Sequence, residues 1–268
     1  MRQFVVLFAL AVVASVASAN LIPQPGFPEG RVINGQEAER GEAPYIVSLQ
    51  TTSGSHFCGG SLINDHTVLT AAHCLTNSQG RVVAGIHGRL DQEGVQTRSF
   101  TNAQYRVHED YSGGVGPNDI GLILLSEPFD LTAVARDGSN PVGVVSLPSK
   151  TFTGTGTGFL YGLGRDNTGS LATNLQKLET KIIDYEACKE ALPSNAPLAT
   201  TNVCSYTANK ADGACNGDSG GPLVMKSDII TFLIGIVSWG YTPCMTTTNP
   251  SVYTDVAAFT DWIEKNQE

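Results

Sequence analysis

The amino-acid sequence predicts an all-β fold, a barrel or a sandwich, because short apolar runs alternate with turn-rich connections from residue 45 onward. The runs span four to six residues and hold many β-branched side chains, which is typical of strands rather than helices. The 29 glycines of the chain allow many tight turns between such strands. The four clearest runs are residues 45–49, 67–70, 120–125 and 233–237.

Two segments have helical character. Residues 184–192 begin at Asp184, a residue type that caps helix N-termini, and carry acidic side chains near their start. Residues 255–266 place Val256, Phe259 and Ile263 at helical spacing, which predicts an apolar stripe that docks on the body of the protein. Both predicted helices are interpreted as structural elements.

The first 19 residues have the pattern of a secretory signal peptide. Arg2 precedes the apolar run 4–13, and Ala17, Ser18 and Ala19 form an A-x-A cleavage pattern. This run is too short for a convincing membrane span, and no run after residue 20 is long enough to cross a bilayer. The sequence therefore predicts a chain that is cut after Ala19 and secreted, with no membrane partner.

The cysteine count and the charge narrow the class of protein. Six cysteines follow the predicted signal peptide, and an even number in an exported chain favours disulfides, with fifteen pairings open from the number alone. The lack of a C-x-x-C pair disfavours a structural zinc site. A formal charge of −9 argues against a nucleic acid partner, which normally meets a basic face.

Residues 20–31 contain three prolines and two glycines, which predicts an extended and mobile segment. The segment ends at Arg31, and a more apolar stretch begins at Val32. A basic residue at the end of such a segment is a place where a protease can cut the chain. An ordinary linker is the alternative interpretation.

A serine framed by glycines lies in the run Gly217-Asp218-Ser219-Gly220-Gly221. Glycine permits a tight backbone with an exposed hydroxyl, and the N–H groups of Gly217 and Ser219 can point at one oxyanion. Serine alone is a poor nucleophile, so catalysis requires a base and a group that orients this base. The motif is short and common, and the rest of the chain has to supply those partners.

His73 and Asp119 suit the two missing roles. His73 follows the small residues Ala71 and Ala72, which leave room around its ring, and Asp119 stands at the start of an apolar run, which favours burial beside an imidazole. In the order His, Asp, Ser, they supply the base, the orienting group and the nucleophile of acyl transfer. The other four histidines, His56, His66, His87 and His108, are interpreted as structural or solvated.

Seven motifs follow one another between Arg31 and the C-terminus: Arg31-Val32-Ile33-Asn34-Gly35, Cys58-Gly59-Gly60-Ser61-Leu62, Thr70-Ala71-Ala72-His73-Cys74, Asn118-Asp119-Ile120, Gly217-Asp218-Ser219-Gly220-Gly221-Pro222, Ser238-Trp239-Gly240 and Val252-Tyr253-Thr254. With these motifs in this order, the sequence closely resembles the trypsin/chymotrypsin-like serine protease family from Arg31 to the C-terminus. It is also similar to the invertebrate digestive chymotrypsins in residues 45–49 and in its short set of cysteine pairs.

The resemblance implies two six-stranded antiparallel β-barrels, an active site between them and a C-terminal helix. His73 and Asp119 would come from the first barrel and Ser219 from the second. His73 would take the proton of Ser219, Asp119 would hold the imidazole tautomer, and the N–H groups of Gly217 and Ser219 would bind the oxyanion. The implied organisation is a signal peptide at 1–19, an activation peptide at 20–31 and a protease domain of two barrel subdomains at 32–268.

The resemblance also implies activation by proteolysis. A trypsin-like protease would cut after Arg31, and the new α-amino group of Val32 would enter the protein and pair with Asp218, whose buried carboxylate is costly when unpaired. Until then the chain would be a zymogen, in which His56 is a candidate to hold Asp218. The implied disulfides are Cys58–Cys74, Cys188–Cys204 and Cys215–Cys244.

In this family three positions shape the specificity pocket, here Gly213 at its base and Gly240 and Ser251 on its walls. Asp212 is one residue away from the base, so the pocket is expected to lack the charge that binds Arg or Lys. An open neutral pocket favours Phe, Tyr, Trp, Leu or Met, through apolar burial of about 2–3 kcal/mol. Elastase-like or broad collagenolytic specificity is the alternative, and trypsin-like cleavage requires Asp212 to turn inward.

Together with the signal-like N-terminus, the resemblance thus implies a secreted, monomeric digestive endopeptidase of the gut lumen, without a cofactor, that acts on proteins and peptides and meets protein inhibitors. Ile86 and Gln96 stand where trypsins place two calcium-binding glutamates, so no metal site is expected in that loop.

Two other classes of protein fit the sequence less well. A catalytically inert binding homologue is disfavoured because His73, Asp119 and Ser219 are all present. A regulatory cascade protease is disfavoured because the predicted pro-segment has only the 12 residues from 20 to 31 and no cysteine.

Overall fold

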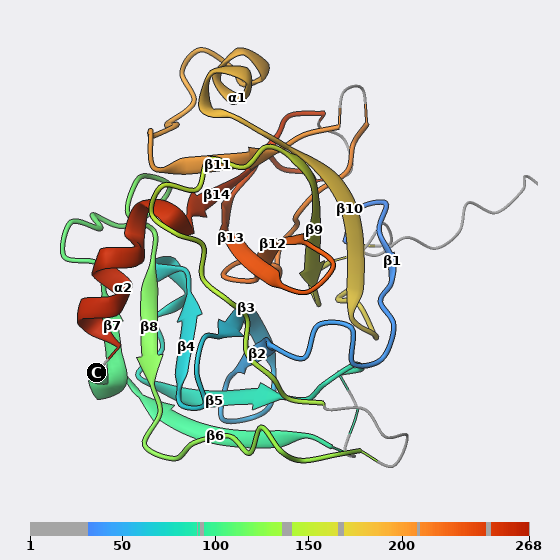
Figure 1. Cartoon of the computed structure of the whole chain (residues 1–268), viewed down its shortest axis with the longest axis vertical. Coiled ribbons are helices and arrows are strands. Elements are labelled where there is room, and N and C mark those ends of the chain that lie inside the picture. Colours follow the sequence, from blue (N-terminus) through green and yellow to red (C-terminus); the bar gives the residue numbers. More distant parts are fainter. Residues whose placement is uncertain are drawn as a thin grey trace, which may run out of the picture.

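The chain folds into two antiparallel β-barrels that lie side by side (Figure 1). The computed structural model describes residues 32–89, 91, 94–135, 141–165, 169–207, 210–244 and 248–267. The predicted signal peptide, residues 1–19, and the predicted activation peptide, residues 20–31, lie outside these described residues.

The N-terminal barrel is built from one sheet with the order β6-β5-β2-β3-β4-β8-β7. Its ends meet because β6 and β7 are consecutive in the chain and only the short 3-10 helix η2 (Asn102–Gln104) separates them. Counting β6 and β7 as one bent strand gives the six strands that the resemblance implies. The strands are β2 (Ile46–Gln50), β3 (His56–Leu62), β4 (Thr67–Thr70), β5 (Gln79–Ala84), β6 (Gln96–Thr101), β7 (Tyr105–Val107) and β8 (Gly121–Leu124).

The C-terminal barrel is a closed ring of six strands, because β9 pairs with both β10 and β12. The ring runs β9-β10-β11-β14-β13-β12, and the two-residue strand β1 (Gln36–Glu37) adds to the edge of β10. The strands are β9 (Gly156–Gly162), β10 (Gln176–Ile183), β11 (Asn202–Ser205), β12 (Pro222–Lys226), β13 (Thr231–Trp239) and β14 (Ser251–Asp255).

The predicted strands and helices are confirmed with small shifts at their ends. Helix α1 (Tyr185–Ala191) begins after Asp184, whose carboxylate accepts the N–H of Ala187 at 2.8 Å. The C-terminal segment starts as the 3-10 helix η3 (Val256–Phe259) and continues as α2 (Thr260–Asn266). Its predicted stripe of Val256, Phe259 and Ile263 is buried. None of the helices in the described part of the chain is long and apolar enough to span a bilayer.

The largest core cluster crosses the boundary between the barrels. It joins N-terminal residues such as Leu49 and Ile123 to Tyr161 of β9, and the rings of Tyr45 and Tyr161 meet edge to face at 6.5 Å. The C-terminal segment adds a second connection, since the ring of His108, next to β7, packs on Phe259 at 5.3 Å (Figure 1 shows α2 beside β7 and β8). Shared apolar burial therefore fixes the barrels against each other.

Candidate active site

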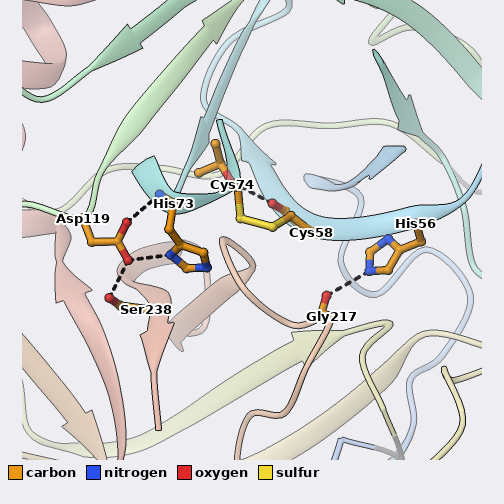
Figure 2. The surroundings of a disulfide bond; sticks show 9 residues. His56, Cys58, His73, Cys74, Asp119, Gly217 and Ser238 are labelled. Carbon is orange, nitrogen blue, oxygen red and sulfur yellow. Dashed lines mark hydrogen bonds and ion pairs between the residues drawn. A yellow bond between two sulfur atoms is a disulfide. The ribbon is translucent and has the colours of Figure 1, made fainter. Parts of the chain in front are cut away.

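The imidazole of His73 is held by the carboxylate of Asp119. His73 belongs to the 3-10 helix η1 (Ala72–Cys74), which follows β4, and Asp119 precedes β8, the neighbour of β4 in the sheet. The Nδ1 atom of His73 lies 2.7 Å from Oδ2 of Asp119, and the backbone N–H of His73 donates to Oδ1 at 2.9 Å. Figure 2 shows both bonds, with the Cys58–Cys74 disulfide on the other side of His73.

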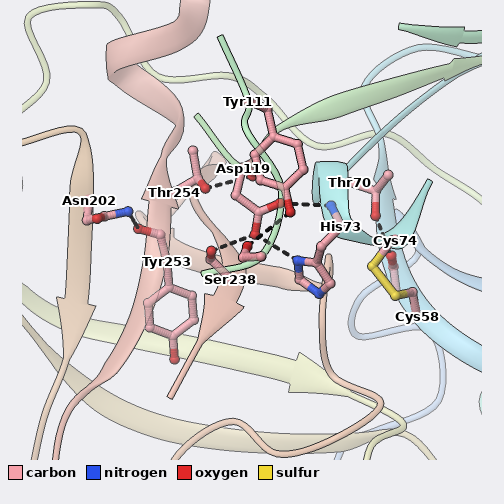
Figure 3. A network of polar contacts seen from close by, with 12 residues as sticks. Cys58, Thr70, His73, Cys74, Tyr111, Asp119, Asn202, Ser238, Tyr253 and Thr254 are labelled. Atoms are coloured by element: carbon pink, nitrogen blue, oxygen red, sulfur yellow. Dashed lines mark hydrogen bonds and ion pairs between the residues drawn. A yellow bond between two sulfur atoms is a disulfide. The ribbon is translucent and has the colours of Figure 1, made fainter. Parts of the chain in front are cut away.

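Two further side chains fix Asp119, which is only 1% exposed. The hydroxyl of Ser238, in β13, donates to Oδ2 of Asp119 at 2.6 Å. The hydroxyl of Thr254, in β14, donates to the backbone oxygen of Asp119 at 2.8 Å (Figure 3). Every buried oxygen of the carboxylate is thus satisfied, and the partners come from both barrels.

The loop that carries Ser219 docks on the strand ends beside His73. The N–H of Gly59 donates to the backbone oxygen of Ser219 at 2.8 Å. Gly220 packs so closely on Thr70 that a Cβ atom there would overlap the Thr70 hydroxyl, and it lies near the N–H of Ala71. Because Thr70 and Ala71 lead directly into η1, these contacts place the Ser219 loop next to the segment that carries His73.

The backbone at Gly217 and Ser219 leaves two N–H groups available. Within the described residues, neither N–H has a hydrogen-bond acceptor. Gly217 has a φ of 99°, which glycine adopts readily, and its oxygen lies 2.8 Å from Nε2 of His56 (Figure 2). The other ring nitrogen of His56 lies 2.7 Å from the hydroxyl of Ser48. His56 therefore fixes the turn that carries both N–H groups, and it is not bonded to Asp218.

The position of His56 also affects its charge. Burial lowers the pKa of His56 below its ordinary value, and Arg89 acts in the same direction, whereas the bond to the Gly217 oxygen opposes the shift. A neutral His56 ring can donate from Nε2 to the Gly217 oxygen and accept at Nδ1 from the Ser48 hydroxyl.

A cavity of about 170 Å³ opens beside Ser219. Its lining contains no Asp, Glu, Lys or Arg among the described residues, and a Cβ atom added at Gly240 would meet no other atom within 4 Å. The cavity is therefore neutral and open on the side of Gly240. The lining residues are Ala214, Cys215, Asn216, Ser219, Val237, Ser238, Trp239, Gly240, Tyr241, Thr242 and Cys244.

Gly213 and Ser251 lie next to this cavity rather than on its lining. The hydroxyl of Ser251 accepts the N–H of Ala214 at 3.1 Å, and it occupies the space that a Cβ atom of Gly213 would need. Asp212 is partly buried, and burial raises the pKa of its carboxyl, although a bond with Thr207 and the nearby Lys210 act in the opposite direction. Asp212 does not line the cavity.

Val32 and Asp218 are both buried in the C-terminal barrel. Val32 packs in the core cluster of this barrel, and Ile33 forms an antiparallel bridge with Gly213. Asp218 accepts N–H bonds from Gly164 at 2.8 Å and Cys215 at 2.9 Å. Burial raises the pKa of Asp218 to about 7, although these two bonds act in the opposite direction. Within the described residues, no cationic side chain pairs with Asp218.

The six cysteines form three disulfides, and they are the pairs that the resemblance implies. Cys58–Cys74 closes the segment that carries η1, and Cys215–Cys244 joins the Ser219 loop to the far side of the cavity. Cys188–Cys204 joins α1 to β11. A histidine and two cysteines cluster at His73, but both cysteine sulfurs are bonded to each other and are not free metal ligands.

The side chain of Gln96 pairs with the backbone of Asp130. Its side-chain oxygen accepts the N–H of Asp130 at 2.8 Å, and its amide donates to the Asp130 oxygen at the same distance. Ile86 is buried and apolar. Neither residue offers a free anionic oxygen in this loop.

The fold and this arrangement define the class of protein. The chain belongs to the trypsin family of serine proteases: the family model described as Trypsin matches residues 32–263. It is a serine endopeptidase whose substrates are proteins.

Relatives from flies match the chain over nearly all of its length. Lectizyme of Glossina austeni is 56% identical over 269 residues, which cover 99% of this chain and 97% of that protein. Trypsin theta of Drosophila melanogaster is 36% identical over 272 residues, 98% of this chain and 97% of that protein. Trypsin of Sarcophaga bullata is 36% identical over 274 residues, 99% of this chain and 98% of that protein.

Sequence reasoning assigned no role to several residues of this site. Ser238 and Thr254 stand in motifs that carry the resemblance, so these motifs could have pointed to them. Their bonds to Asp119 were not predicted. Ser48, the partner of His56, stands in an ordinary strand sequence, and no local pattern identifies it.

Proposed function

We propose that this serine protease is a secreted, chymotrypsin-like endopeptidase, made as a zymogen and cut after Arg31, that hydrolyses peptide bonds after large apolar or aromatic residues. The observation that carries the proposal is the neutral, open cavity beside Ser219. A large apolar side chain that enters this cavity gains about 2–3 kcal/mol from burial. A guanidinium or ammonium group there would lose its hydration without gaining a partner charge.

The proposed chemistry follows from the hydrogen bonds around His73. Because Nδ1 of His73 lies 2.7 Å from Oδ2 of Asp119, the Nδ1–H tautomer is favoured and Nε2 is left as the proton acceptor. His73 takes the proton of Ser219 while the hydroxyl oxygen attacks the substrate carbonyl. His73 then returns the proton to the leaving amine, and water completes the hydrolysis of the acyl-enzyme by the same route.

The two N–H groups without acceptors supply the oxyanion hole of the proposed mechanism. The N–H groups of Gly217 and Ser219 would donate to the oxygen of the tetrahedral intermediate, which carries the charge that develops during attack. Removing one such donor costs about 2.7–4 kcal/mol in a serine hydrolase of different fold that uses the same chemistry. The bond between His56 and the Gly217 oxygen supports the proposal because it holds the turn in place before the substrate arrives.

Three other substrate specificities are alternatives for this cavity: trypsin-like, elastase-like and broad collagenolytic. Two of the relatives are named trypsins, which suggests cleavage after Arg or Lys, but Gly213 offers no carboxylate at the base and Asp212 does not line the cavity. The hydroxyl of Ser251 fills the space beside Gly213, next to the cavity, and a side chain in this place favours an elastase-like or a broad collagenolytic enzyme. The open side at Gly240 favours the larger side chains.

Activation by a cut after Arg31 is supported by Val32 and Asp218. A buried carboxylate without a cation is costly, and a free α-amino group at Val32 would supply the missing charge. Val32 also has a φ of 53°, a conformation that β-branched residues rarely adopt. Cutting the bond before Val32 removes the preceding peptide group, so Val32 no longer has to hold this unfavourable φ angle.

Secretion and digestive use in the gut lumen rest on the signal-like N-terminus and on the family resemblance. A monomer, a trypsin-like activating protease and protein inhibitors are proposed on the same basis. Residues 1–19 are proposed as the signal peptide, 20–31 as the activation peptide and 32–268 as the protease domain.

The test uses the secreted full chain and the variants Arg31→Gln and Ser219→Ala. Each protein is incubated with trypsin, repurified, checked for Val32 as the new N-terminus, and treated with a labelled fluorophosphonate, which acylates reactive serines. We expect label on Ser219 only in the cut wild-type chain. Full labelling of uncut Arg31→Gln would contradict the zymogen proposal. A cut wild-type chain that takes up no label would instead be an inert binding homologue.

A further inference from the structure

The segment from Val32 to Ala43 runs along the outside of the C-terminal barrel before the chain enters the N-terminal barrel. Ile33 bridges to Gly213, β1 pairs with β10, and the N–H of Ala38 donates to the oxygen of Leu175 at 2.9 Å. Figure 1 shows β1 along the edge of β10. This segment, residues 32–43, is here called the N-terminal strap.

Glu42, near the end of the strap, gathers donors from three strands of the C-terminal barrel. Its Oε1 atom lies 2.8 Å from Nζ of Lys177 in β10, 3.0 Å from Nζ of Lys226 in β12 and 2.8 Å from the hydroxyl of Tyr161 in β9. Its Oε2 atom accepts the N–H of Glu39 at 3.0 Å. The carboxylate is therefore fully satisfied and joins the strap to β9, β10 and β12 at one point.

The partners of Glu42 keep its carboxylate ionised. The side chain of Glu42 is only 15% exposed, and that of Lys177 only 18%. Burial alone would raise the pKa of Glu42, but its bonds with Lys177, the Glu39 N–H, Tyr161 and Lys226 lower it to about 2. Lys226 also lies over the rings of Phe159 and Tyr161, 5.1 Å from each ring centre, so it is held on two sides.

Two of the strands that Glu42 holds lead directly to the groups around Ser219. Tyr161 is followed by Gly162 and Gly164, and both pack so closely on Asp218 that a Cβ atom on either would overlap its carboxylate. The N–H of Gly164 also donates to Oδ1 of Asp218. On β12, Lys226 stands four residues after Pro222, the residue where the Ser219 loop ends and the strand begins.

We propose that Glu42 is a positioning residue for activation: it clamps the strap to β9, β10 and β12 and thereby keeps Val32 in its buried position beside the Asp218 loop. The proposal rests on the proposed zymogen mechanism, because it concerns the step in which Val32 stays inserted after the cut. Losing the clamp shifts the equilibrium toward a state with Val32 released and the Ser219 loop less ordered. Coupling between two sites of a protein typically changes a binding equilibrium by about 5–150-fold, which sets the scale of the expected effect.

The experiment compares cut wild-type protein with Glu42→Gln, Lys177→Met and the control Glu39→Gln. Glu39 is three residues away and exposed, and only its backbone takes part in the cluster. Cleavage at Arg31 is brought to completion and checked by N-terminal sequencing. Three quantities are measured at a temperature well below unfolding: kcat/KM on a peptide substrate, the rate at which acetic anhydride modifies the Val32 α-amine, and the effect of added Val-Ile dipeptide.

For Glu42→Gln we expect kcat/KM to fall about tenfold and the Val32 amine to be modified faster by a similar factor. Millimolar Val-Ile should restore much of the activity, because the dipeptide fills the site that Val32 has left. Lys177→Met should shift in the same direction, and wild type and Glu39→Gln should not respond to the dipeptide. This rescue separates positioning from a loss of stability alone.

Unchanged kcat/KM and unchanged amine modification in Glu42→Gln would overturn the proposal. A lowered Tm without faster modification would also overturn it, since the clamp would then act on stability only. Equal activity of uncut and cut wild-type protein would instead contradict the zymogen mechanism, whatever Glu42→Gln does, so the two failures are distinguishable.

Discussion

The hydroxyl of Ser238 donates to the same oxygen of Asp119 that binds His73. The two distances to Oδ2 are 2.6 Å from Oγ of Ser238 and 2.7 Å from Nδ1 of His73. Ser238 lies in β13 of the C-terminal barrel, whereas Asp119 and His73 belong to the N-terminal barrel. The orientation of the imidazole therefore depends on how the two barrels are placed against each other.

Replacing Ser238 with alanine tests this dependence. A hydrogen bond to a charged group contributes about 1.5–3 kcal/mol, so kcat/KM for Ser238→Ala should fall about tenfold or more. Steady-state kinetics on a peptide substrate measures the effect. Ser227→Ala is the matched control, because Ser227 lies in the exposed β12–β13 turn and, in the part of the chain that the structure describes, bonds only to Ile230. Equal losses in both variants would contradict a specific role for Ser238.

The raised pKa of Asp218 predicts the pH dependence of stability in the uncut chain. Burial raises this pKa to about 7 from an ordinary value of 3.8, so the folded state keeps a proton that the unfolded state releases between these values. Stability is therefore highest below about pH 4 and is lost as the pH rises toward about 7. The measurement is Tm from pH 4 to 8 on Arg31→Gln/Ser219→Ala, which cannot be activated.

The variant that also carries Asp218→Asn isolates this effect. Burial raises the pKa of Asp255 to about 6, which gives a decline of the same sign, and this contribution remains in both proteins. The difference between the two Tm curves should therefore grow from pH 4 to 7 and then level off. Parallel curves would mean that Asp218 does not titrate in this range.

Gly213 and Ser251 predict how the specificity can be changed. Gly213→Asp would place a carboxylate at the base of the pocket, but a Cβ there overlaps the Ser251 hydroxyl and the φ of 134° is unfavourable for side chains. Gly213→Asp alone should therefore lower Tm and activity. Gly213→Asp/Ser251→Gly should recover part of both and gain cleavage after Arg, measured with paired Phe and Arg substrates. Ser251→Gly is the control, and Arg cleavage by it alone would contradict this explanation.

His56 is predicted to support catalysis by fixing the turn that carries the N–H groups of Gly217 and Ser219. His56→Phe keeps the bulk of the ring but loses the bond to the Gly217 oxygen, so kcat should fall about tenfold with little change in KM. The exposed ring of His66, whose bonding partner among the described residues is its neighbour Asp65, provides the control His66→Phe. A rise in KM at constant kcat would place the effect in substrate binding instead.

The fold was largely predictable because its strands are short, apolar and separated by turn residues. Residues 67–70 became β4 without a shift, and residues 45–49 became β2 one residue later. The pattern left a barrel and a sandwich equally open, since both bury strands of this kind. The resemblance supplied the two barrels, because closure depends on strand pairs such as β9 with β12 that are far apart in sequence.

The site was predictable where chemistry demands particular residue types. His73 and Asp119 were singled out from their local sequence, and the structure brings them together. Glu42 was not singled out, because its partners Lys177 and Lys226 are 135 and 184 residues away along the chain. A single glutamate has no local sequence pattern that marks such a role. Ser48 was missed for the same reason, since only the fold brings it to His56.

The most direct test of the proposed function is a comparison of substrates after activation. The secreted chain is cut with trypsin, repurified with Val32 as its N-terminus, and assayed on otherwise identical peptides ending in Phe, Leu, Ala and Arg. We predict that kcat/KM is highest for Phe or Leu and that this activity appears only after the cut. Fastest cleavage after Arg would contradict the neutral pocket, and equal activity before the cut would contradict the zymogen.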